Sequence, residues 1–127
     1  MMTRIDARDR LIVALDVPSA AEADALVARM GDQVRFVKVG LELYTVAGPD
    51  IVRKLVDRGK RVFLDLKFLD IEETVRRATA RVAAMGATFL TVHANRKALI
   101  AAVQGRGSSD LKLLAVTVLT NFDGEDL

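Results

Sequence analysis

Apolar residues fall into five short runs along the chain, and a more polar stretch separates each run from the next. Short apolar runs bounded by turn residues are typical of buried strands, whereas apolar positions at helical spacing indicate amphipathic helices. The pattern predicts strands over residues 11–15, 36–40, 61–68, 88–94 and 113–119. It predicts helices over residues 19–30, 50–58, 71–85 and 97–103. Strands and helices therefore alternate, which favours a parallel sheet with right-handed crossovers.

Several helix boundaries have their own sequence signals. Ser19 followed by Glu22 forms a capping box, and Gly31 is placed to end the helix that this box begins. Gly86 similarly ends the long third helix. The glycine-rich segment 105–109 enters a strand and does not open a helix, so it lacks the context of a phosphate-binding loop. We interpret this segment as a solvated loop.

The order of elements fits an α/β fold of the TIM, or (β/α)8, barrel type. Such a barrel has eight strands and typically about 250 residues. This chain has 127 residues and about five strand–helix units. The sequence therefore predicts a single domain over residues 1–127, which forms the N-terminal part of an incomplete barrel.

Composition narrows the classes of function. Hydrophobic residues make up 51% of the chain and charged residues 28%, which is ordinary for a globular protein. The net charge of +2 and the 5% aromatic content do not favour a nucleic-acid partner. The absence of cysteine excludes disulfides and thiolate chemistry. No apolar run reaches membrane-spanning length and the N-terminus lacks the apolar core of a signal peptide, so we expect a cytoplasmic protein.

The third predicted strand carries the most informative residues. Asp65 and Lys67 are two positions apart, and a regular strand places such residues on one face. Burying two ionisable groups is costly unless they pair with each other or act on a ligand. Asp70 adds a second carboxylate just beyond the strand, at the end where barrel enzymes keep their active sites. The alternative is an ion pair that only fixes the register of the strand.

Two earlier strands repeat this pattern. Asp16 follows the first strand and Lys38 lies within the second. In isolation, Asp16 could cap a helix and Lys38 could extend its ammonium group to solvent. Together with Asp65, Lys67 and Asp70, they form a set of alternating charges at the carboxyl ends of three successive strands. This set predicts a catalytic network.

With these residues the chain resembles the orotidine 5'-phosphate decarboxylase family, whose enzymes convert orotidine monophosphate to UMP in de novo pyrimidine biosynthesis. The resemblance extends over essentially all 127 residues. It is carried by the Asp-x-Lys-x-x-Asp block of residues 65–70, which gains specificity from Asp16, Lys38 and Thr120 at matching strand ends. The matching segments are 15–18, 38–40, 65–67, 70–71 with Thr74, 91–94 and 116–120.

The resemblance implies roles for individual residues. Lys67 corresponds to the proton donor to C6 of the pyrimidine, and Asp65 to the carboxylate held beside the carboxylate of the substrate. Lys38 and Asp16 match positions that bind the ribose hydroxyls, and Thr120 matches a threonine near the substrate. The implied reaction uses no cofactor and no metal ion. Its catalytic residues are Lys67, Asp65, Asp70 and Lys38.

The resemblance also implies a homodimer with shared active sites. Asp70, Ile71 and Thr74 match residues that reach into the site of the partner subunit. Many family members have His-Asp-Ile-Pro-Asn-Thr where this chain has residues 69–74, so the turn here lacks the histidine and the proline. The family binds the substrate phosphate with segments after the later strands of the barrel. A polypeptide of residues 1–127 alone is therefore expected to be inactive.

Two other functions are compatible with the sequence. A sister enzyme of the same barrel group, a sugar-phosphate decarboxylase or aldolase that uses magnesium, shares the Asp-x-Lys-x-x-Asp block. Those relatives usually carry a glutamate at the position of Lys38, so Lys38 argues against them. The second alternative is a truncated, non-catalytic half-barrel that associates with itself through uncovered strand edges.

Overall fold

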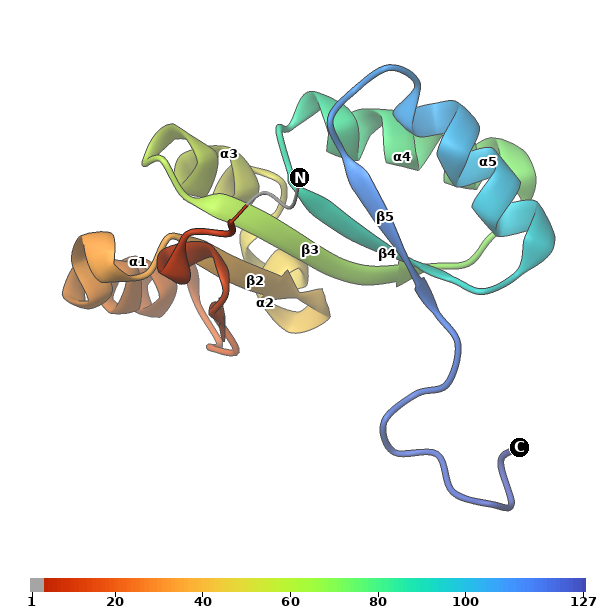
Figure 1. Ribbon diagram of the computed structural model, residues 1–127, viewed down its shortest axis with the longest axis horizontal. Coiled ribbons are helices and arrows are strands. Elements are labelled where there is room, and N and C mark those ends of the chain that lie inside the picture. Colours follow the sequence, from red (N-terminus) through yellow and green to blue (C-terminus); the bar gives the residue numbers. More distant parts are fainter. Residues whose placement is uncertain (1–3) are drawn as a thin grey trace.

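Five parallel strands follow one another across a single sheet in the order of the sequence. A computed structural model describes residues 4–127 (Figure 1). Residues 1–3, at the N-terminus that was predicted to lack the apolar core of a signal peptide, lie outside this range. The strands are β1 (Ile12–Ala14), β2 (Phe36–Gly40), β3 (Arg61–Phe68), β4 (Phe89–His93) and β5 (Lys112–Val116). The helices are α1 (Ala20–Met30), α2 (Leu41–Ala47), α3 (Asp50–Asp57), α4 (Glu72–Ala84) and α5 (Arg96–Arg106), with short 3-10 turns η1 (Ala7–Asp9) and η2 (Gly31–Gln33).

The predicted strands are all present, and two of them have the predicted bounds. β2 and β3 occupy residues 36–40 and 61–68, while β1 and β4 are slightly shorter than predicted. The prediction of strand over residues 117–119 is wrong, because β5 ends at Val116. At the edge of the sheet β5 pairs only with β4, whose last residue, His93, lies opposite Val116. Beyond that point, no other strand of the described residues lies beside β5, and the chain runs away from the sheet (Figure 1).

Two features of the helices differ from the predictions. The sequence pattern did not predict α2, a helix of seven residues whose N-cap, Gly40, offers no side-chain hydrogen bond. The prediction of a solvated loop over residues 105–109 is wrong in its first part, because α5 continues to Arg106. The Arg106 side chain turns back and donates to the carbonyl oxygens of Leu111 and Ser109, at 2.6 Å and 3.0 Å. The other predicted helices are confirmed, including the Ser19 cap, whose hydroxyl accepts from the Glu22 N–H at 3.1 Å.

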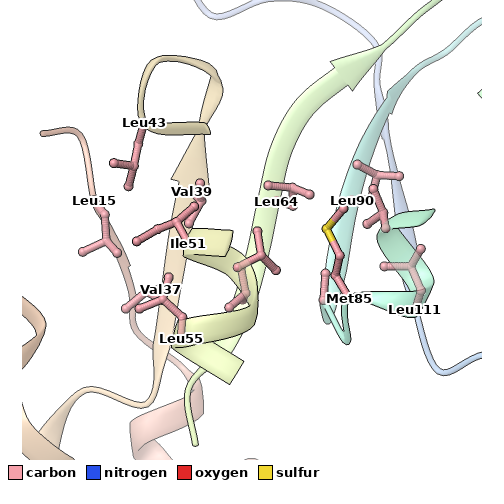
Figure 2. Packing of buried hydrophobic residues seen from close by; sticks show 14 of the residues in the cluster. Leu15, Val37, Val39, Leu43, Ile51, Leu55, Leu64, Met85, Leu90 and Leu111 are labelled. Carbon is pink, nitrogen blue, oxygen red and sulfur yellow. The ribbon is translucent and has the colours of Figure 1, made fainter. Parts of the chain in front are cut away.

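The hydrophobic core lies between one face of the sheet and the helices. Alternate residues of the three central strands, Val37 and Val39, Val62 and Leu64, and Leu90 and Val92, are all fully buried. Figure 2 shows Val37, Val39 and Leu64 against Ile51 and Leu55 of α3, with Leu90 beside Met85 and Leu111. Burial of apolar surface on this scale stabilises the fold by about 25 cal/mol per Å². It also fixes the register of each strand, because a slip of one residue would turn these side chains away from the core.

The opposite face of the sheet is concave. The rings of Phe36 on β2 and Phe89 on β4 stack with centroids 5.5 Å apart, although β3 lies between those strands. Phe63 of β3 meets Phe89 edge-on, with centroids 6.0 Å apart. Side chains two strands apart make contact in this way only where the sheet curves toward them. The curvature is that of a barrel wall, so the α/β fold with a partial (β/α) barrel is confirmed.

Charged side chains lie at the amino-terminal ends of the strands. Asp9 is paired with Arg35 at 3.2 Å and with Arg61 at 3.6 Å, and its side chain is only 12% exposed. The Arg61 guanidinium also lies over the Phe36 ring, 4.8 Å from its centroid. These contacts tie η1 to the beginning of β2 and β3. In the described part of the chain, no helix is long and apolar enough to cross a membrane.

Candidate active site

Three adjacent strands bring four polar side chains to the concave face. Lys38 lies in β2, Asp65 and Lys67 lie toward the end of β3, and Thr91 lies in β4. Lys38, Asp65 and Thr91 are each flanked in sequence by residues of the hydrophobic core, such as Val37 and Leu64, so the strand alternation that buries those residues turns these three side chains the other way. The sequence pattern that builds the core therefore also builds the site.

Asp65 is the centre of an ion cluster. The Lys67 Nζ lies 3.0 Å from Asp65 Oδ1 and 3.1 Å from Oδ2, so the ammonium group bridges both carboxylate oxygens. The Lys38 Nζ approaches Asp65 Oδ2 at 3.5 Å from the neighbouring strand. The Asp65 side chain is 12% exposed, compared with 27% for Lys38 and 41% for Lys67. Two cations and one anion leave a net positive charge beside the carboxylate, which suits an anionic ligand.

Hydrogen bonds keep Asp65 ionised. Burial acts to raise the pKa of the Asp65 carboxyl, but the Thr91 hydroxyl and the Lys67 ammonium both hydrogen-bond to it and lower it. The charges of Lys67 and Lys38 act in the same direction, and the net result is a pKa below the usual range for aspartate. The site therefore holds a carboxylate anion between two ammonium groups at neutral pH.

The backbone at Lys67 has an unusual conformation. Lys67 has a φ of 50°, and it is the only non-glycine residue in the described range with positive φ. The β3–β4 register shifts between Leu64 and Phe68, so the strand is irregular where the site is formed. A left-handed conformation costs a side-chain-bearing residue about 1–2 kcal/mol, and such strain is typically retained at functional sites. The regular alternation that predicted a shared face is broken here, yet Lys67 still meets Asp65.

A pocket extends from the ion cluster to the segment after β5. Its volume is about 410 Å³, within the range of small-molecule sites. Lys38, Asp65, Lys67 and Thr120 all line it, and Thr120 comes from the segment that leaves the sheet. The remaining lining residues are Val116, Val118, Leu119 and Asn121. The structure thus brings together four of the eight residues predicted for the site.

The other four predicted residues lie outside this pocket. Asp16 is exposed and lies beside the end of β2, where a Cβ added to Gly40 would be 3.7 Å from its Oδ1. Asp70 and Ile71 line a separate pocket of about 400 Å³ between the turn after β3 and the turn after β4. The Asp70 Oδ1 accepts from the Ile71 N–H at 2.7 Å. Thr74 is exposed on the first turns of α4.

Two residues of the site had no predicted role. Thr91 donates to Asp65 Oδ1 at 2.7 Å and accepts from the Lys67 N–H at 2.9 Å. Asn121 lines the pocket beside Thr120. For Thr91 a signal was available, because it is a polar residue within an apolar strand; Asn121 carries no such signal. No group of three or more carboxylate, imidazole or thiol side chains that could hold a metal ion occurs within residues 4–127.

Comparison with known proteins places these residues in a family. Residues 9–127 match the family described as orotidine 5'-phosphate decarboxylase / HUMPS. The chain belongs to this family. It is 51% identical over 127 residues to orotidine 5'-phosphate decarboxylase of Bradyrhizobium sp. (strain BTAi1 / ATCC BAA-1182), covering all of this chain and 52% of the relative. It is 54% identical over 121 residues to the Nitrobacter winogradskyi protein of that name, covering 95% and 50%.

The solved structures agree with this family membership. The chain superposes on the crystal structure of orotidine 5'-phosphate decarboxylase from Lactobacillus acidophilus with a TM-score of 0.83 and 40% identity, covering 91% of this chain and 55% of that one. An uncharacterized conserved protein from Geobacillus kaustophilus also has a TM-score of 0.83, with 41% identity. The chain spans about half the length of the decarboxylase-family proteins that it matches.

Proposed function

We propose that the protein containing this chain decarboxylates orotidine 5'-phosphate to UMP, with Lys67 as the proton donor to C6. The observation that carries this proposal is the Lys67 ammonium group, held 3.0 Å from Asp65 Oδ1 at the wall of the pocket with Lys38 beside it. Family membership and the names of the relatives support it. The reaction belongs to de novo pyrimidine biosynthesis, which we expect to take place in the cytoplasm.

The proposed chemistry uses only side chains. When CO2 leaves C6, the electron pair of the broken C–C bond stays on that carbon as a carbanion. A fixed ammonium group at Lys67 stabilises this charge as it develops, and then donates a proton to form the C6–H bond. Lys67 is left neutral and regains its proton from solvent. Asp65 holds the Lys67 side chain in place before the reaction, and its negative charge next to the substrate carboxylate disfavours the ground state.

Substrate binding is divided among the other predicted residues. In the proposal, Lys38 and Asp16 bind the ribose hydroxyls and Thr120 contacts the substrate from the segment after β5. Asp70, Ile71 and Thr74 complete the site of a second subunit in a homodimer. Support for that division comes from the separate pocket that Asp70 and Ile71 line within one chain.

The alternative within the same barrel group is a magnesium-dependent enzyme acting on sugar phosphates. The position of Lys38 argues against it, because an ammonium group 3.5 Å from Asp65 Oδ2 would repel a divalent cation from that carboxylate. An assay with and without Mg²⁺ separates the two functions. Turnover of a sugar phosphate only with Mg²⁺, and none of orotidine monophosphate, would replace our proposal with this alternative.

A direct test compares two lysine variants of the protein at its natural length. Lys67→Ala should abolish UMP formation from orotidine monophosphate while the fold stays nearly intact, as judged by circular dichroism. Lys54→Ala is the matched control, since Lys54 is an exposed lysine of α3 outside the site. It should leave turnover unchanged. Near-normal turnover of Lys67→Ala would overturn the assignment of the proton donor.

A further inference from the structure

Thr91 contacts both halves of the Asp65–Lys67 pair. Its hydroxyl donates to Asp65 Oδ1 at 2.7 Å and accepts from the backbone N–H of Lys67 at 2.9 Å. A hydroxyl has one donor and can accept at the same time, so this single group meets both needs. Thr91 is only 6% exposed, and it lies in the middle of β4. Its position is therefore fixed by the sheet and by the packing around it.

The irregular pairing of β3 and β4 explains why the Lys67 N–H uses a side chain. Leu64 lies opposite Leu90, and Phe68 lies opposite Val92. Between these two pairs β3 has the three residues 65–67, whereas β4 has only Thr91. The extra residues bulge out of the ladder, as in other β-bulges, and Lys67 takes its left-handed conformation there. The Thr91 hydroxyl takes the place of the strand carbonyl that would accept the Lys67 N–H in a regular ladder.

We propose that Thr91 is a positioning residue, which fixes the Lys67 ammonium group relative to Asp65 and the substrate by holding the bulge and the carboxylate with one hydroxyl. This inference deepens the proposed function and rests on it. Without the hydroxyl, the Lys67 N–H loses its partner and β3 relaxes toward regular pairing. The Lys67 side chain then leaves its place above Asp65, and small displacements of a reacting group greatly reduce the rate of the chemical step.

The test uses three variants of the protein at its natural length. Thr91→Val has nearly the same shape but no hydroxyl, and Thr91→Ser keeps the hydroxyl. The control is Thr79→Val, since Thr79 of α4 is also buried and its hydroxyl has no hydrogen-bond partner within residues 4–127. We expect Thr91→Val to lower kcat by about tenfold or more, since the chemical step depends on orientation. KM should stay within about threefold because ribose contacts are kept. Thr91→Ser and Thr79→Val should retain nearly full kcat.

A second readout does not depend on activity. The titration of the Asp65 carboxyl, followed by its side-chain carbon signal in NMR, should move to higher pH in Thr91→Val and stay in place in Thr91→Ser. The charged groups that face Asp65, Lys38 of β2 and Lys67 of β3, are the same in all variants. If the parent protein does not decarboxylate orotidine monophosphate, the proposed function fails, and the titration still decides whether Thr91 organises the pair.

Each outcome bears on the proposal. An unchanged kcat and an unchanged Asp65 titration in a folded Thr91→Val would overturn it. So would a loss of kcat in Thr79→Val equal to that in Thr91→Val, which would indicate a general effect of losing a buried hydroxyl. Should Thr91→Val fail to fold, Thr91→Cys replaces it, because its thiol is a weak donor at the same place. A kcat for Thr91→Cys as high as that of Thr91→Ser would then contradict the role of the hydroxyl bond.

Discussion

Gly105 of α5 lies against the main chain of Arg76 in α4. A Cβ added at Gly105 would overlap the Arg76 carbonyl oxygen, and it would lie 3.0 Å from both the carbonyl carbon of Arg76 and the Cβ of Thr79. Backbone atoms cannot move aside as a flexible side chain can, so the two helices approach this closely only because residue 105 has no side chain. The glycine is therefore required by packing, within a helix where it would otherwise be unfavourable.

This contact predicts the effect of adding one methyl group. Gly105→Ala should destabilise the protein by about 1–3 kcal/mol, because overpacking outweighs the gain in helix propensity. Ala102→Gly is the converse control, since Ala102 is a fully buried residue of the same helix. Ala102→Gly should destabilise the protein, because it loses side-chain packing and helix propensity. Urea unfolding followed by circular dichroism measures both, and a Gly105→Ala protein as stable as the parent would contradict the close approach.

The left-handed conformation of Lys67 predicts an inverted order of stability for two substitutions. In a regular strand, glycine is about 0.5–1 kcal/mol less favourable than alanine. At a φ of 50°, alanine keeps the steric cost of its Cβ while glycine does not, so Lys67→Gly should be at least as stable as Lys67→Ala. Lys112 of β5, which lacks positive φ, is the matched site. At that site Lys112→Gly should be less stable than Lys112→Ala in urea unfolding. A Lys67→Gly protein that is less stable than Lys67→Ala would disprove the strained backbone.

Acid should weaken the protein partly through Asp65. Because the pKa of Asp65 is lower in the folded protein than in the unfolded chain, its carboxylate contributes stability above its unfolded pKa. That contribution is lost as the pH falls through the folded pKa, where the carboxylate binds a proton. The free energy of unfolding should therefore fall less steeply below about pH 4 in Asp65→Asn than in the parent protein. Asp110→Asn removes an exposed carboxylate and serves as the control. If the free energy of unfolding falls equally steeply with decreasing pH in Asp65→Asn and in the parent protein, the ion cluster is contradicted.

The placement of Asp70 predicts that two inactive proteins can restore activity together. If Asp70 completes the site of a second subunit, mixing Lys67→Ala with Asp70→Ala should give hybrid dimers with one intact site. A mixture of Lys67→Ala with Asp65→Ala should remain inactive, since Asp65 and Lys67 belong to the same pocket of one chain. UMP formation after verified subunit exchange is the measurement. A shared site is excluded if the first mixture recovers no more activity than the second.

A polypeptide of residues 1–127 alone should associate with itself and have negligible decarboxylase activity. β1 and β5 lie at the two edges of the sheet, and Ile12, Leu114 and Val118 are 38%, 39% and 49% exposed near them. Unpaired edges with apolar side chains favour association between chains. Sedimentation measures the mass of the associated species. Leu114→Lys should reduce that mass, because it places a charge on the edge strand β5. A stable monomer, or turnover matching that of a full-length decarboxylase, would contradict this expectation.

Much of the fold could be predicted because the central strands follow a simple rule. In β2 and β3, valine and leucine alternate with residues that face the concave side, and this pattern gave the correct bounds. Strand ends are harder to predict, because the end of β5 depends on where its neighbour β4 ends. α2 was missed since only Leu43 among its residues is buried, which leaves no amphipathic stripe to recognise.

The site was predicted less completely than the fold. The charges of Lys38, Asp65 and Lys67 stood out because ionisable groups within apolar strands need a partner. The left-handed backbone at Lys67 could not be predicted, since a lysine gives no local signal for positive φ. The role of Thr91 depends on a bulge between two strands, which is a property of their pairing and not of either segment alone. Gly105 was misinterpreted as part of a loop, because its close contact with α4 is visible only in three dimensions.

The ion cluster is drawn from three successive strands, β2, β3 and β4, and from neither edge of the sheet. Its contacts lie within β3 or join strands that are neighbours both in the sheet and along the chain, with partners 24 to 27 residues apart. The cluster is therefore complete in sequence once β4 has been synthesised. For the same reason, a circular permutation that opens the chain outside β2–β4 should leave this cluster whole.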